Sequence, residues 1–260
     1  MFFSLFQFLL CINVVNSIHT FFDETIPPKV IALMSMQRSG STTVSRLLSS
    51  HKCTVWGNEI FSGGNQDVLG AHETLGYTPE ETRKNPLQFL LEVNKSICKQ
   101  VPSECNGRCT IVVKIFNIHQ LSENGISDII SSDDIGIVVL QRELKDWYSS
   151  SVAAWTMNDW NTTPHDNRPV REVFDNVPTK DKARYTEWFD KIRSLSTYLG
   201  KMYLEIPFSS VQTCALFDMV IPSIYNFFGF NLEDGVDIRN SWKGDNIEEI
   251  LMSCGDVVFF

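Results

Sequence analysis

A run of anion-binding residue types follows the apolar stretch "KVIALM" at positions 29–34. A turn between a buried strand and a helix exposes backbone N–H groups at the positive end of the helix dipole, where a phosphate or sulfate group binds well. The turn here is "QRSGSTT", and its members suited to an anion are Arg38, Ser39, Gly40, Ser41, Thr42 and Thr43. The glycine lets the backbone approach a ligand closely, and the guanidinium can hold two anionic oxygens at once. The stretch predicts an anion-binding loop, because an N-cap serine beside a surface arginine would explain only one of the four hydroxyls.

This loop differs from the phosphate loop of nucleotide hydrolases. A Walker A loop reads G-x-x-x-x-G-K-[ST], and both its leading glycine and its lysine are missing here. The later apolar run "IGIVVL" ends in Gln141 and Arg142, where such an enzyme usually offers an aspartate to magnesium. Magnesium-dependent phosphoryl transfer is therefore disfavoured.

Apolar, β-rich runs indicate the strands that must position the loop. They cover 29–34, 110–116, 135–140 and 202–208. Helical patterns follow the first run at 42–51 and the third at 145–155, and others cover 183–202 and 215–230, the last interrupted or capped around Pro222 and ended by Gly229. Alternating buried strands and helices predict an α/β fold with a central parallel β-sheet flanked by helices. The polar, proline-bearing segment 158–182 is long enough for a substrate-side loop or lid.

Composition agrees with one ordinary domain. The chain has 260 residues, of which 43% are hydrophobic and 20% charged, and this length suits a single core. A net charge of −9 provides no general attraction to nucleic acid, so no nucleic acid partner is expected. A local basic groove can still exist beneath that average.

The first 17 residues have the pattern of a secretory signal peptide. They are apolar from Phe2 to Val15 and carry no charged side chain. An uncleaved signal anchor is the alternative, although the stretch is shorter than the ~20 residues of a spanning helix. We therefore expect residues 1–17 to be a signal and 18–260 to form one domain, with membrane contact only if the anchor is retained. The expected location is the secretory pathway, either the Golgi lumen or outside the cell.

Cysteine content fits an oxidising compartment. Six cysteines follow the signal, an even number that disulfides can pair: Cys53, Cys98, Cys105, Cys109, Cys214 and Cys254. The sequence leaves their connectivity open. The cluster "CKQVPSECNGRC" favours a local disulfide over zinc because no histidine lies at ligand spacing, and free buried cysteines are the remaining alternative. Glycosylation sequons at Asn94 and Asn161 suit the same compartment.

Two motifs together resemble the P-loop sulfotransferases that use 3′-phosphoadenosine 5′-phosphosulfate (PAPS). "QRSGSTT" looks like their 5′-phosphosulfate loop, and "VVLQRELKDWYSSS" resembles their 3′-phosphate site, a strand ending in arginine followed by a helix bearing serine. The similarity runs from Lys29 to Gly229 and is nearest to carbohydrate-modifying, nodulation-type members. It implies a P-loop NTPase-like sulfotransferase fold, with PAPS as co-substrate and adenosine 3′,5′-bisphosphate as product. It also implies that Arg38 and the hydroxyls after it hold the phosphosulfate, and that Arg142 and Ser150 bind the 3′-phosphate.

The resemblance also suggests catalytic residues. Related enzymes carry a catalytic glutamate at a similar distance after the loop, which implies that Glu59 is the general base. Lys114 interrupts an apolar strand, where an ammonium is costly unless it reaches solvent or an anion, so we assign it to the sulfate together with Arg38. The alternatives are a solvated turn glutamate and an edge-strand lysine. His72 and His119 are alternative bases.

Lys243, in a C-terminal loop, is a further candidate for binding the 3′-phosphate of the donor.

The acceptor is less defined than the donor. We expect a glycan or glycoprotein acceptor, with Trp155 and Trp160 available to stack on a sugar, although both can equally be core residues. Tyrosine of a secreted protein is the alternative. Sulfuryl transfer requires a base, donors for the developing charge and in-line placement, with no obligatory metal. A catalytically silent secreted nucleotide-binding protein and a nucleotide kinase with a degenerate loop stay open as different classes.

Overall fold

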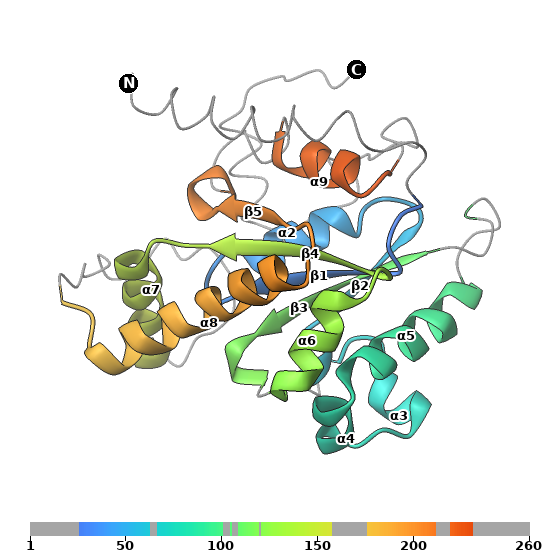
Figure 1. Ribbon diagram of the computed structural model, residues 1–260, viewed down its shortest axis with the longest axis horizontal. Helices are drawn as coiled ribbons and strands as arrows, with labels where there is room; N and C mark the ends of the chain where they lie inside the picture. Colours follow the sequence, from blue (N-terminus) through green and yellow to red (C-terminus); the bar gives the residue numbers. More distant parts are fainter. Residues whose placement is uncertain are drawn as a thin grey trace.

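A parallel β-sheet of five strands lies at the centre of the described part of the chain (Figure 1). The computed structural model describes residues 26–62, 67–100, 105, 109–119, 121–157, 176–211 and 219–230. The strands are β1 (Val30–Ser35), β2 (Thr54–Asn58), β3 (Thr110–Phe116), β4 (Ile135–Gln141) and β5 (Leu204–Pro207), in the order β2-β3-β1-β4-β5. Each neighbouring pair is parallel. The predicted α/β fold with a central parallel sheet is confirmed.

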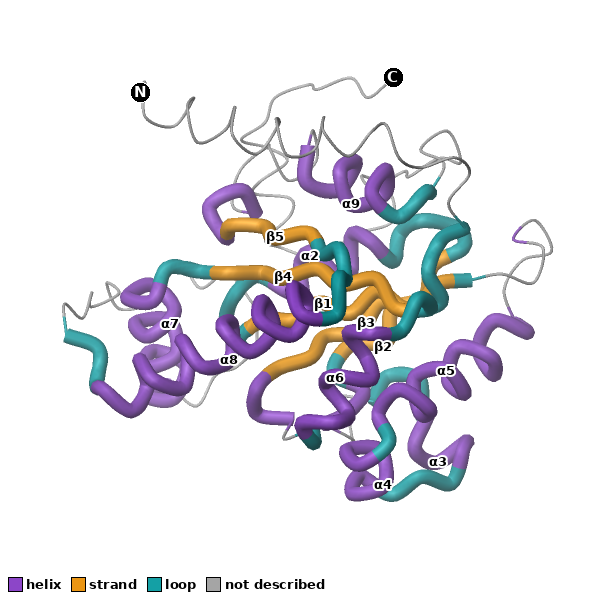
Figure 2. Tube along the Cα trace, in the orientation of Figure 1, coloured by secondary structure: helices purple, strands orange, loops and turns teal. Residues whose placement is uncertain are grey.

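Helices cover both faces of this sheet (Figure 2). One face carries α2 (Ser41–Leu48) and α9 (Ile221–Phe227). The other carries α3 (Ala71–Leu75), α4 (Pro79–Lys84), α5 (Pro86–Ile97), α6 (Glu123–Ser131), α7 (Leu144–Met157) and α8 (Thr179–Tyr198). Strand side chains alternate between the faces: in β1, Ile31 and Leu33 pack with α2 and α9, whereas Val30, Ala32 and Met34 pack with the larger group. No helix within these described ranges is both long and apolar enough to cross a membrane.

Most of the strands and helices lie at the positions that the apolar patterns of the sequence predicted. The apolar runs at 110–116 and 135–140 form β3 and β4, the latter one residue longer. The stripe that starts at Ala183 belongs to α8, which begins earlier, at Thr179, and ends at Tyr198. α9 has a proline in its first turn, and Gly229 adopts a left-handed φ of 73° after its end.

Strand β2 was not predicted. Its sequence "TVWGN" has no sustained apolar run, and its pairing with β3 shifts register between Trp56 and Asn58. Gly57 sits at that shift, where an added Cβ would lie 2.8 Å from Val113 Cγ1. A bulge of this kind requires a small residue and hides the strand pattern.

Two disulfides lie near the amino-terminal ends of β2 and β3. Cys98 and Cys109 form a local disulfide, as the cluster predicted, whereas Cys105 pairs with the distant Cys53. Cys214 and Cys254 lie outside the described residues, as do the signal segment 1–17, Asn161, Trp160 and Lys243. The sequon residue Asn94 is buried, and its Nδ2 donates to the carbonyls of Lys29 and Cys109 at 2.8 and 2.9 Å. The nitrogen to which a glycan would attach is thus part of the packing.

The disulfides should contribute to stability by an amount that rises slowly with the length of the loop each one closes. Replacing Cys98 and Cys109 by serine opens a loop with a sequence separation of 11, and replacing Cys53 and Cys105 opens one of 52. We expect the free energy of unfolding to fall by about 3 kcal/mol in the first variant and about 4 kcal/mol in the second, because the longer loop restricts the unfolded chain more. Urea denaturation measures both values, and midpoints equal to that of the parent protein would contradict this role.

Candidate anion-binding and transfer site

The predicted site residues meet at the carboxyl edge of the sheet. The register places Met34 of β1 beside Ile115 of β3 and Val139 of β4, so the segments that follow all three strands leave from one edge. Open parallel sheets bind ligands at this edge. The turn after β1 leads directly into α2.

The loop itself has the geometry that an anion requires. Gly40 is the N-cap of α2 with a left-handed φ of 75°, and no side chain caps the helix. The first-turn N–H groups of Ser41, Thr42 and Thr43 therefore have no acceptor inside the helix. Ser39 is 1% exposed, and its hydroxyl has no hydrogen-bond partner among the described residues. Arg38 has a left-handed φ of 65°, a conformation that is uncommon outside glycine and concentrates at ligand sites.

Arg142 connects the two predicted nucleotide motifs. It follows β4, is buried, and its Nη1 donates to the Arg38 carbonyl at 2.7 Å. Its guanidinium lies over the Phe208 ring, 4.1 Å from the centroid. The Tyr185 hydroxyl, from α8, donates to the Arg142 carbonyl. The arginine is therefore held at its backbone and at its side chain.

Ser150 lies on α7, two helical turns beyond Arg142, and is half-buried. The neighbouring hydroxyls of Ser149 and Ser151 donate to the carbonyls of Lys145 and Trp147 within the helix. Those two serines are engaged by their own helix, so Ser150 is the serine of this trio that stays a candidate for a ligand.

Lys114 joins the loop to the predicted base. Its Nζ donates to Thr42 Oγ1 and to Glu59 Oε1, each at 3.0 Å, and its side chain is 3% exposed. Strand β3 lies between β2 and β1, so the edge-strand alternative is wrong. Burial lowers the pKa of the Lys114 ammonium, and Glu59 acts in the opposite direction. A buried ammonium is tolerated when it is paired in this way.

Glu59 is placed by a sharp turn at the end of β2. Asn58, the last residue of that strand, is buried and has a left-handed φ of 52°. The Glu59 side chain is 18% exposed and paired with Lys114, so it is not the solvated turn glutamate of the alternative reading. Its second oxygen, Oε2, accepts from the Ser62 hydroxyl at 3.5 Å.

Neither alternative histidine presents a basic nitrogen to solvent: His119 Nδ1 accepts a hydrogen bond, and His72 Nδ1 is buried. The backbone N–H of Phe116 donates to His119 Nδ1 at 3.1 Å, so the ring proton must be on Nε2. Burial, with the charges of Lys114 and Arg83, lowers the pKa of His119 to about 3. His72 Nε2 lies 2.8 Å from the Ile60 carbonyl and must donate to it. Both rings therefore support the turn that follows Glu59.

Several site residues had no signal in the sequence. No motif marks Ser62, Phe208 or Tyr185, because their partners are distant in the sequence. Ser62 lies 57 positions from His119, Tyr185 lies 43 from Arg142, and Phe208 packs against Arg142. The turn at Asn58 was also missed, although an asparagine before a candidate catalytic residue is compatible with left-handed backbone.

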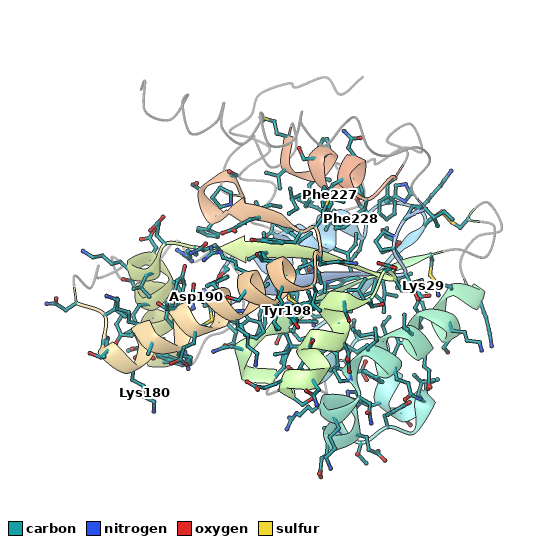
Figure 3. The ribbon with its side chains drawn as sticks, viewed as in Figure 1. Lys29, Lys180, Asp190, Tyr198, Phe227 and Phe228 are labelled. Atoms are coloured by element: carbon teal, nitrogen blue, oxygen red, sulfur yellow. A yellow bond between two sulfur atoms is a disulfide. The ribbon has the colours of Figure 1, made fainter. Side chains whose placement is uncertain are left out.

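A separate groove lies at the other edge of the sheet. Its volume is about 750 Å³, and Lys29, Asn94 and Cys98 line it with residues of α5. Figure 3 shows Lys29 at the opposite end of the sheet from α7. The groove is therefore remote from the candidate site. Within the described segments, no group of three or more His, Cys, Asp or Glu side chains could hold a metal ion.

His119 should make stability sensitive to acid. In the folded state its pKa is about 3, whereas an exposed histidine titrates near 6.5. The unfolded state therefore binds more protons between these values, so this contribution is complete above pH 6.5 and is lost as the pH falls toward 3. We expect a loss of a few kcal/mol across that window in urea titrations. A His119→Gln variant should lack this component, and an identical pH dependence in both proteins would contradict the assignment.

No protein-family model and no curated protein matches this chain. Among solved structures, the sulfotransferase domain of the Synechococcus olefin synthase is 13% identical, with a TM-score of 0.43, covering 88% of this chain and 82% of its own. A sulfotransferase from Mycobacterium tuberculosis is 14% identical, with a TM-score of 0.41, covering 90% and 75%. Shikimate kinase from Acinetobacter baumannii, in complex with shikimate, is 11% identical, with a TM-score of 0.35, covering 78% and 94%. Two of these three structures are sulfotransferases.

Proposed function

We propose that this protein transfers a sulfuryl group from PAPS to a hydroxyl of an acceptor. One observation carries the proposal: Lys114 Nζ contacts both Thr42 of the anion-binding loop and the carboxylate of Glu59. The donor-binding group and the candidate base therefore meet at one buried cation. Sulfuryl transfer needs this combination, because the leaving group gains negative charge while the acceptor hydroxyl loses a proton.

The donor site consists of two connected parts. Arg38, Ser39 and Gly40, with Ser41, Thr42 and Thr43, hold the phosphosulfate, and the buried Ser39 hydroxyl supplies a donor for it. Arg142 and Ser150 bind the 3′-phosphate. The bond from Arg142 to the Arg38 carbonyl supports one continuous site. A guanidinium fork and helix N-terminal amides are both suited to such oxygens.

The reaction is an in-line displacement. Glu59 takes the proton of the acceptor hydroxyl while that oxygen attacks sulfur, and the bond from sulfur to the bridging oxygen breaks with its electron pair leaving on adenosine 3′,5′-bisphosphate. An ammonium has three N–H donors. Thr42 and Glu59 accept two of those of Lys114, and the third is the one we assign, with Arg38, to the charge on the bridging oxygen. This step requires no metal.

The acceptor we propose is a carbohydrate in the secretory pathway, in the Golgi lumen or outside the cell. Two disulfides suit an oxidising compartment. Trp155, near the end of α7, is 47% exposed and offers an aromatic face for a sugar. A glycan or glycoprotein would be the partner, with protein tyrosine as the alternative acceptor.

Donor binding can be tested without knowing the acceptor. Adenosine 3′,5′-bisphosphate titrated in EDTA into the protein without residues 1–17 should bind, because the site uses side chains and amides rather than a metal. The double variant Arg142→Ala, Ser150→Ala should lose this binding. Calorimetry measures both. Absent binding to a folded protein, or tighter binding of ATP with magnesium, would contradict the proposal and favour a kinase.

Glu59→Gln should separate chemistry from binding. Loss of the base should lower transfer from labelled PAPS to glycan acceptors by about 10²–10⁴-fold, while binding of adenosine 3′,5′-bisphosphate stays within about twofold. Glu80→Gln, an exposed glutamate on α4, is the matched control and should leave both unchanged. Unchanged transfer in Glu59→Gln would exclude Glu59 as the base. Binding without transfer in the parent protein would indicate a silent binding protein.

A further inference from the structure

Ser62, which the proposed chemistry does not use, contacts the Glu59 carboxylate oxygen that Lys114 leaves free, and His119 in turn contacts Ser62. The turn η1 (Ile60–Ser62) is closed by the Ser62 N–H, which donates to the Glu59 carbonyl at 2.8 Å. It places Ser62 Oγ 3.5 Å from Glu59 Oε2 and 3.1 Å from His119 Nε2. Lys114 holds the other carboxylate oxygen. The carboxylate is thus contacted at both oxygens.

The hydrogen bonds that link Phe116, His119, Ser62 and Glu59 have a fixed direction. A backbone N–H can only donate, so the bond from Phe116 N–H to His119 Nδ1 places the ring proton on Nε2. Nε2–H must then donate to the Ser62 oxygen, which leaves the Ser62 hydrogen to point at Glu59. Such chains strengthen each member by polarisation.

The environment of His119 also keeps its imidazole ring neutral. It is 2% exposed, and its ring packs against Phe61 and Phe116, with centroid separations of 6.0 and 5.3 Å. A neutral ring that already carries its proton on Nε2 cannot accept another from Ser62. The arrangement therefore excludes a serine nucleophile activated by histidine. The role left for His119 and Ser62 is to orient the Glu59 carboxylate.

We infer that Ser62 and His119 are positioning residues that aim the Glu59 carboxylate through the chain His119 Nε2–H to Ser62 Oγ–H to Glu59 Oε2. This inference rests on the proposed function of Glu59. Without Ser62, only Lys114 would hold the carboxylate, through one oxygen. The Lys114 ammonium must also stabilise the charge on the bridging oxygen of PAPS. The hydroxyl fixes the carboxylate independently of Lys114, and the buried ring fixes the hydroxyl.

Nitrogen NMR of the histidine rings tests the chain without any substrate. At neutral pH, His119 should show the neutral tautomer protonated at Nε2, and Ser62→Ala should shift its Nε2 and Nε2–H resonances. Ser62→Ala leaves the bond from Phe116 to Nδ1 in place, so the tautomer should be unchanged. A proton on Nδ1, a charged ring, or an Nε2 resonance insensitive to Ser62→Ala would overturn the inference, whether or not the protein transfers sulfate.

Kinetics then test its effect on the reaction. Ser62→Ala should lower kcat by about tenfold to a hundredfold, while the KM for PAPS and binding of adenosine 3′,5′-bisphosphate stay within about twofold. Ser62→Thr should restore most of kcat because it keeps the hydroxyl. His119→Gln, which can accept from Phe116 and donate to Ser62, should stay near the parent, whereas His119→Leu should resemble Ser62→Ala. A kcat unchanged in Ser62→Ala, or equally reduced in Ser62→Thr, would overturn the inference. Failure of the parent protein to bind the nucleotide would instead overturn the proposed function.

Discussion

The Lys114 ammonium is buried on the face of the sheet that α2 covers, and its pairing determines how the rest of the site is arranged. A buried cation needs partners in fixed positions, and here they come from two different strand ends, Thr42 after β1 and Glu59 after β2. The order β2-β3-β1 puts the lysine strand between them. Lys114 alternates with Val113 and shares a face with Val112, which packs against α2. The side chain therefore points at α2, whose first turn belongs to the predicted anion-binding loop.

Arg142 provides the second connection. Strand β4 pairs with β1 on the other side, so the residue after β4 reaches the backbone of the loop after β1. Its contacts with the Phe208 ring and the Arg38 carbonyl hold the guanidinium in one orientation, as the proposed binding of a phosphate requires. Cations from two strands thus flank one loop, and a net charge of −9 does not prevent a local anion site.

The sequence predicted those parts of the structure that depend on local pattern. Buried parallel strands are near-continuous apolar runs, which located β1, β3 and β4. A shorter apolar run located the edge strand β5, of which only Ile206 is buried, and residue types alone predicted the loop. Strand β2 was not predicted because a bulge at Gly57 interrupts its apolar pattern. The pairing of Cys53 with Cys105 and the contact of Lys114 with Glu59 join residues 52 and 55 positions apart. Such contacts follow from strand order, and strand order is a property of the whole fold.

We propose that one anion-binding site, assembled by Lys114 and Arg142, holds both phosphates of the nucleotide beside Glu59. A crystal structure of the protein with adenosine 3′,5′-bisphosphate, grown in EDTA, would show where the two phosphates bind. We expect the 5′-phosphate against the first-turn amides of α2 and Lys114 Nζ, and the 3′-phosphate within about 3 Å of donors on Arg142 and Ser150. A nucleotide bound elsewhere, such as in the groove beside α5, or bound only with a metal, would contradict it.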